Sequence, residues 1–125
     1  MKSEKLTQFA NQKYINLETY RKDGRSVQTP VWFAQEGGVF YIYSLADAGK
    51  VKRIRNNAQV RVVPCTMRGQ VTGEWVEAKA SILDGAEAER GNKLLTQKYG
   101  IWKRLGNLFR KFRKREHAVM AIRFD

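Results

Sequence analysis

The chain has too few cysteine and histidine residues for the chemistry that those residues usually carry. It contains one cysteine, Cys65, and one histidine, His117, in 125 residues. A single cysteine excludes an internal disulfide and a multi-cysteine metal site, and a single histidine leaves zinc without a usable ligand set. We therefore expect no metal centre and no catalytic side chain of these types. We interpret Cys65 as a buried strand residue and His117 as the start of the last strand.

Long apolar runs are also missing. None approaches the roughly 18 residues that suggest a membrane span, and residues 1–9 lack the apolar core of a secretory signal. The chain has no internal repeat and no low-complexity linker, so we expect one domain over residues 1–125. The expected protein is cytoplasmic and has no transmembrane segment.

Negative charge is scarce: 12 acidic residues face 24 basic ones, for a net charge of +12. Such a chain attracts polyanions, which include nucleic acids, acidic lipid headgroups and phosphorylated cofactors. Charge alone does not choose among them. Segment 101–115 combines large apolar residues at helical spacing with many cations. It fits an amphipathic helix packed on the domain, an interface or lid over a ligand site, or a contact with nucleic acid or a membrane surface.

Alternating and aromatic-rich runs separated by turn signals predict a mainly β protein. Asp23-Gly24 predicts a hairpin between the first two strands, and Pro30 places the second strand at a sheet edge or a bulge, because proline cannot donate to a ladder. Asp84 is an expected N-cap and Gly100 an expected C-terminal stop for a helix. A small barrel with helices at its rim follows, with strands at 14–20, 26–34, 39–43, 60–66, 74–83 and 118–124 and helices at 3–13, 49–56 and 86–99.

Segment 44–57 places four cations directly behind a strand and a glycine. A strand that turns into a helix with cations in its first turns is a ready anion site, because free N–H groups and the helix dipole both favour a phosphate there. The alternative is a solvated helix face. Within the helix, Val51 and Ile54 are spaced to face the core. The four cations, Lys50, Lys52, Arg53 and Arg55, should look outward, and Arg55 lies a turn further from the helix start than Lys50.

Two motifs in this order carry a family resemblance. They are Thr29-Pro30-Val31-Trp32-Phe33 and Gly49-Lys50-Val51-Lys52-Arg53-Ile54-Arg55. With the strands around them, they resemble the pyridoxamine 5'-phosphate oxidase-like superfamily, whose fold is the FMN-binding split β-barrel. The chain is most similar to the small members that use the deazaflavin coenzyme F420.

The resemblance implies a homodimer with cofactor sites at the interface and a cofactor that is coenzyme F420 or FMN. The strand over residues 28–32 would lie beside the cofactor ring and offer backbone groups to its polar edge. The helix after the third strand would hold the cofactor phosphate. The cofactor, and no catalytic side chain, would supply the hydride chemistry with a small conjugated organic substrate. The implied cofactor-binding residues are Gln28, Thr29, Pro30, Val31, Trp32, Ser44, Lys50, Lys52 and Arg53.

Two other functions stay open at this point. One is a non-catalytic binding protein for a flavin or for a tetrapyrrole such as heme or biliverdin, since the superfamily includes such members. The other is a nucleic-acid-binding barrel driven by the positive charge. The nucleic-acid alternative ranks lowest, because the chain lacks arginine-glycine repeats and the aromatic sheet motifs of such proteins. Trp32 fits core or dimer packing as well as the ring site.

Overall fold

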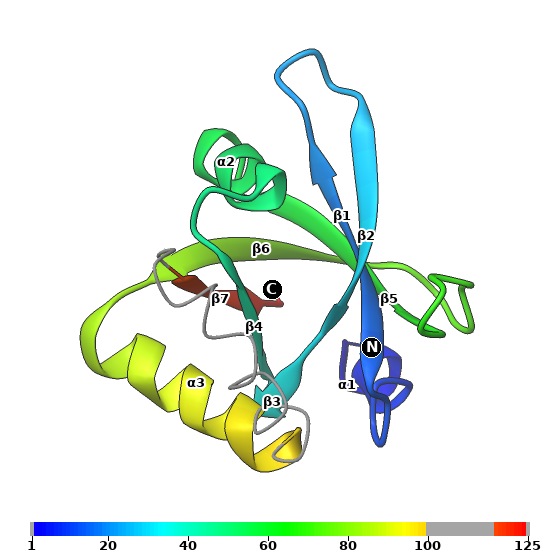
Figure 1. The fold of residues 1–125 in the computed structure, drawn as a ribbon. Coiled ribbons are helices and arrows are strands. Elements are labelled where there is room, and N and C mark those ends of the chain that lie inside the picture. The colour runs from blue at the N-terminus through cyan, green and yellow to red at the C-terminus, as the bar shows by residue number, and fades with distance from the viewer. Residues whose placement is uncertain (1, 100–116, 125) are drawn as a thin grey trace.

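The strands form one antiparallel sheet that curls into an open barrel (Figure 1). The structure, a computed structural model, describes residues 2–99 and 117–124. Within these residues the strand order is β2-β1-β5-β6-β7-β4-β3. The predicted fold class, a mainly β split barrel with peripheral helices, is confirmed. The strands are β1 Tyr14–Tyr20, β2 Ser26–Trp32, β3 Ala34–Glu36, β4 Val39–Leu45, β5 Gln59–Cys65, β6 Val76–Leu83 and β7 His117–Arg123.

Strand β2 lies at one edge of the sheet, as Pro30 predicted. It pairs with β1 through a hairpin in which Tyr20 lies opposite Ser26. The predicted single strand over 26–34 is wrong at its end, because the chain changes partner at Phe33. Phe33 is fully buried, and the residues after it form β3, which pairs with β4 at the other edge of the sheet.

The barrel interior is lined by alternate residues of the strands, as the sequence pattern predicted. Phe9 is also fully buried, with its ring against Phe33 and Phe40 at centroid distances of 6.2 and 4.9 Å. The first helix ends before Phe9 enters the core. Helix α1 covers only Lys2–Thr7, and Asn11 has a φ of 61°, so the predicted helix over 3–13 is too long.

Two helices cover the barrel. Helix α2, Gly49–Asn56, has the predicted bounds and buries Val51 and Ile54 against β1 and β6 at one end of the barrel. Helix α3, Gly85–Lys98, packs on the outer side of β3, β4 and β7. Asp84 has the extended backbone of an N-cap but makes no side-chain capping bond. Gly100 and segment 101–115 lie outside the described residues. No helix among the described residues is long and apolar enough to cross a membrane.

Candidate functional site

The start of α2 is open to an anion. Ala48 occupies the N-cap position without a side-chain cap, and its carbonyl accepts from the N–H groups of Val51 and Lys52. Within the described residues, no acceptor takes the N–H of Gly49 or Lys50, and the first turn holds no acidic residue. The positive end of the helix dipole is therefore uncompensated.

Two cations of α2 lie closer to the protein than the sequence pattern suggested. Lys50 and Arg53 are half-buried, whereas Lys52 and Arg55 are exposed. Arg53 Nε donates to Thr19 Oγ1 at 2.6 Å, and its guanidinium lies over the first turn of the helix. A Cβ added at Gly49 would stand 2.7 Å from Arg53 Nη1, which confirms how closely the guanidinium approaches the start of α2.

Electrostatics at the start of α2 favour a negative ligand. Burial, and then repulsion from Arg53, lowers the pKa of Lys50. Burial, and then repulsion from Arg21, lowers the pKa of Arg53. In the part of the chain that the structure describes, no carboxylate lies within ion-pair distance of these three cations. An anion placed here would remove repulsion that the folded chain otherwise carries.

Ser44 lies at the end of β4, on the same face as the core residues Phe40 and Ile42, and it is buried. Its Oγ donates to the carbonyl of Leu45 at 3.3 Å. The structure thus places Ser44 before α2 in the chain but with its hydroxyl already engaged. A contact between Ser44 and a phosphate stays a prediction.

The strand edges beside β2 and β4 offer backbone groups. In the described sheet β2 pairs only with β1, and β4 beyond Tyr41 has no partner on the β3 side. The two strands contact each other near β3 and then diverge, β4 toward α2 and β2 toward the hairpin (Figure 1). Pro30 has no N–H, so its position fits an outward-facing edge site, and Gln28 and Trp32 share that orientation along the strand. These edges can bind the polar rim of a planar ring.

The exposed side chain of Gln28 covers a polar network around the buried Asn16 and Glu18 of β1. Gln28 Nε2 donates to Glu18 Oε2 at 3.0 Å, and Asn16 Nδ2 reaches Gln28 Oε1 at 3.5 Å. Arg61 donates to both carboxylate oxygens of Glu18, at 2.8 and 3.0 Å, and Tyr20 donates to Oε1 at 2.9 Å. The hydrogen bonds from Arg61 are the main reason that the pKa of Glu18 is lowered. The alternation over 14–20 predicts a half-buried strand, but Asn16 and Glu18 are buried as well, so β1 is buried on both faces.

Trp32 is held by a residue that sequence reasoning missed. Its indole stacks on the Tyr99 ring, with centroids 4.7 Å apart and planes 6° apart. Tyr99 Oη lies 2.6 Å from the carbonyl of Lys13 and 2.8 Å from that of Phe33, and it accepts from the N–H of Phe33 at 3.3 Å. Burial raises the pKa of Tyr99 to about 12. Tyr99 therefore fixes the end of β2 and the orientation of Trp32.

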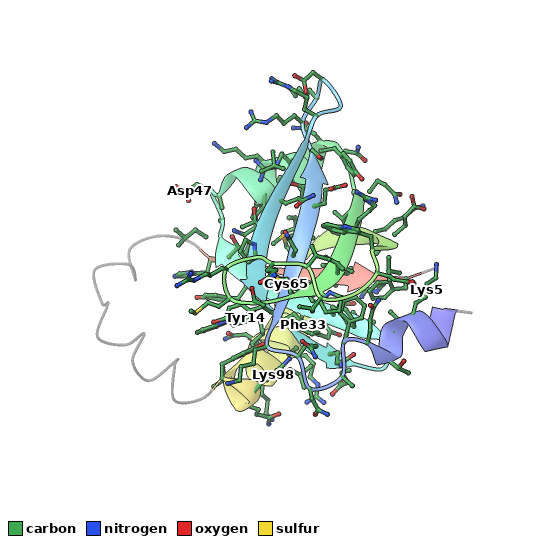
Figure 2. All side chains as sticks on the ribbon, turned by 90° about the vertical axis from the view of Figure 1, so that its right-hand side faces the viewer. Lys5, Tyr14, Phe33, Asp47, Cys65 and Lys98 are labelled. Carbon is green, nitrogen blue, oxygen red and sulfur yellow. The ribbon has the colours of Figure 1, made fainter. Side chains whose placement is uncertain are left out.

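Lys98, the residue before Tyr99, also contacts the carbonyl of Phe33. Its Nζ donates to the carbonyls of Gln12 and Phe33, at 2.7 and 2.8 Å, and lies 3.9 Å from the centroid of the Phe33 ring. Figure 2 shows Lys98, Phe33 and Tyr14 in one region of the molecule. Burial lowers the pKa of Lys98 to about 8. Nothing in the sequence around Lys98 and Tyr99 indicates that they hold the end of β2.

The remaining candidates are simpler. Cys65 is buried, and burial raises the pKa of its thiol, so the prediction of an inert strand residue agrees with the structure. His117 is exposed, and its ring stacks on Tyr43 at a centroid distance of 4.8 Å. The described residues contain no cluster of His, Cys, Asp or Glu suited to a metal ion.

The curled antiparallel sheet, open between β2 and β4 and covered at one end by a basic helix, defines a split β-barrel. A sequence profile of the pyridoxamine 5'-phosphate oxidase family matches residues 1–125. The chain belongs to this family. None of the curated proteins compared with the chain matches it in sequence.

Several solved structures share the fold. The heme storage protein HutZ from Vibrio cholerae matches with a TM-score of 0.67 and 15% identity, over 98% of this chain and 89% of that protein. An F420-H2 dependent reductase matches with a TM-score of 0.63 and 18% identity, over 88% and 93%. A FAD-binding protein from Mesorhizobium loti matches with a TM-score of 0.65 and 17% identity, over 100% and 88%. At these identities the likeness is one of fold.

Proposed function

We propose that the chain is an oxidoreductase that binds coenzyme F420 or FMN and exchanges a hydride with a small conjugated organic substrate. One observation carries the proposal: in a chain of this family, two half-buried cations that have no carboxylate partner among the described residues meet an uncapped helix start. Such a site favours a phosphate. The likeness to an F420-H2 dependent reductase supports this choice of cofactor class.

The proposed phosphate ligands are Lys50, Arg53 and the N–H groups at the first turn of α2, with Lys52 at the exposed rim. Ser44 is a proposed ligand only if its hydroxyl leaves the carbonyl of Leu45. A bound flavin or deazaflavin supplies the hydride chemistry itself. The chain holds and orients the ring, and charge on a reduced ring is stabilised by backbone N–H donors and nearby cations.

The ring is proposed to lie along the unpaired edge of β2, over residues 28–32. Trp32 is positioned there by its stacking on Tyr99. The outward backbone groups of Gln28, Pro30 and Trp32 are proposed to meet the ring, whereas Thr29 and Val31, whose side chains point toward the barrel interior and whose backbone groups face β1, would hold that edge in place. A second copy of the chain is proposed to complete the site as a homodimer, in keeping with the family, and the exposed Met67 offers an apolar contact for it.

Titration of the purified chain with FMN and with coenzyme F420, followed by absorption and fluorescence, tests the proposal. We expect binding of at least one at micromolar concentration. Lys50→Ala should weaken it about tenfold, which corresponds to about 1.4 kcal/mol, because a charge-assisted contact to the phosphate is lost. Arg55→Ala removes an exposed cation of the same helix and serves as the matched control. Absence of binding to either cofactor contradicts the proposal.

A tetrapyrrole carrier is the second candidate. The exposed ring of His117, stacked on Tyr43, is the only imidazole in the chain and could ligate iron. The likeness to the heme storage protein is in keeping with this function. Addition of hemin should then give a sharp Soret band that His117→Ala abolishes, and wild-type protein without such a band excludes the candidate.

A further inference from the structure

The hairpin between β1 and β2 carries a third cation toward the start of α2. Arg21 follows the last paired residue of β1, and its N–H donates to the carbonyl of Arg25 at 2.8 Å, so the ladder continues one step beyond the strand. Gly24, with a φ of 89°, closes the turn. Arg21 therefore keeps strand geometry and shares a face with Thr19, roughly 7 Å further along.

Thr19 is the residue that Arg53 contacts. The bond from Arg53 Nε to Thr19 Oγ1, at 2.6 Å, ties the middle of α2 to β1. One step along the same face stands Arg21, and its charge contributes to the lowered pKa of Arg53. Figure 1 shows the hairpin rising beside α2. Lys50, Arg53 and Arg21 thus form a line of three cations that runs from the helix start to the hairpin.

The acidic residue of the hairpin does not neutralise this line. Asp23 is held by Arg25, whose Nε lies 2.8 Å from Oδ2 and whose N–H donates to Oδ1 at 3.0 Å. Arg21 lowers the pKa of Asp23 only as a lesser influence after these bonds. Within the described residues, Arg21 makes no ion pair.

A single phosphate monoester does not match three cations, because it brings only about −1.5 to −2 charges. We propose that the line binds two anionic groups of one cofactor: a first phosphate at Lys50, Arg53 and the start of α2, and a second anionic group that Arg53 shares with Arg21. The cofactor would then carry an anionic extension beyond its first phosphate, either a second phosphate or carboxylates. This inference rests on the proposed function for the first position.

Comparison of three cofactors in two variants tests the inference. FMN ends at one phosphate, FAD carries a diphosphate, and coenzyme F420 carries carboxylates beyond its phosphate. Arg21→Gln should weaken the tighter of FAD and coenzyme F420 about fivefold, as expected for a partly exposed charged contact. FMN should change by less than about twofold in the same variant. Lys22→Gln, an equal charge change at the exposed neighbouring position, should leave all three within about twofold.

A competition measurement with anions that carry no ring tests the two anionic positions alone. Inorganic pyrophosphate should displace a bound cofactor from the wild type at a lower concentration than inorganic phosphate does, and Arg21→Gln should reduce that difference. If Arg21→Gln weakens the binding of FMN as much as that of FAD and coenzyme F420, the effect is one of overall charge and the inference is overturned. The same holds if Arg21→Gln and Lys22→Gln weaken the binding of the cofactors equally. If FMN binds through Lys50 while neither extended cofactor depends on Arg21, the inference fails and the proposed function stands. If no cofactor binds the wild type, both fail.

Discussion

Replacing Gly91 by alanine should destabilise the protein, although the sequence alone predicts the opposite. Gly91 lies in the middle of α3, where alanine is a better helix former by about 1 kcal/mol. In the folded chain, however, Gly91 is buried against the outer face of the sheet. A Cβ there would stand 2.7 Å from Cδ1 of Tyr41 and 2.8 Å from Cγ1 of Val119.

The two effects have opposite signs, and packing should win. Neither contact is the end of a flexible side chain: one is a ring atom on β4, and the other belongs to a buried β-branched residue of β7 whose χ1 is stiff. Overpacking of this kind costs about 1–3 kcal/mol. After the gain in helix propensity, we expect a net loss of about 1 kcal/mol in the free energy of unfolding, or roughly 3–6 °C in Tm.

Denaturant unfolding followed by circular dichroism measures this difference. Lys93→Ala, at an exposed position of the same helix, is the control and should change the free energy of unfolding by less than about 0.5 kcal/mol. Val119→Ala removes one of the two clashing atoms. In that background the Gly91→Ala penalty should shrink by about 0.5 kcal/mol or more. A Gly91→Ala protein that is more stable than the wild type refutes the packing argument.

Three further outcomes follow from buried polar groups. Tyr99→Phe should lower the free energy of unfolding by about 1–3 kcal/mol, because it leaves buried backbone groups without a partner. A spectrophotometric titration of the wild type should show one tyrosine that ionises near pH 12. Unfolding should become easier as pH rises from about 10 to 12, since Tyr99 ionises in that range only in the unfolded chain. Glu18→Gln should lower the free energy of unfolding by about 1–3 kcal/mol near neutral pH. Because the pKa of Glu18 in the folded protein lies below 4.5, the wild type should lose this extra stability as pH falls below about 4.5. If the stability of the two proteins changes with pH in the same way, the carboxylate does not have this role. Cys65 should react with a thiol reagent only at the rate of unfolding, and rapid labelling of the native protein would show that the thiol is accessible.

Much of the fold followed from local patterns. The alternation over 14–20 and the glycine-bounded helix over Gly49–Asn56 gave elements with the observed bounds, because a half-buried strand and an amphipathic helix each repeat with a fixed period. Pro30 placed β2 at an edge through the chemistry of one residue. The break at Phe33 could not be predicted, because it depends on which distant strand pairs with residues 34–36.

The candidate site divides in a similar way. The sequence by itself determined that a strand leads into a basic helix without acidic residues in its first turn, so an anion site could be predicted from residue types and order. Only the tertiary structure decided that Lys50 and Arg53 are half-buried while Lys52 and Arg55 are not. It also decided that Arg21 of the β1–β2 hairpin acts on Arg53, and that Trp32 rests on Tyr99. The physical reason is that burial and the repulsion between cations depend on segments that are distant along the chain, whereas helix and strand periods depend on near neighbours.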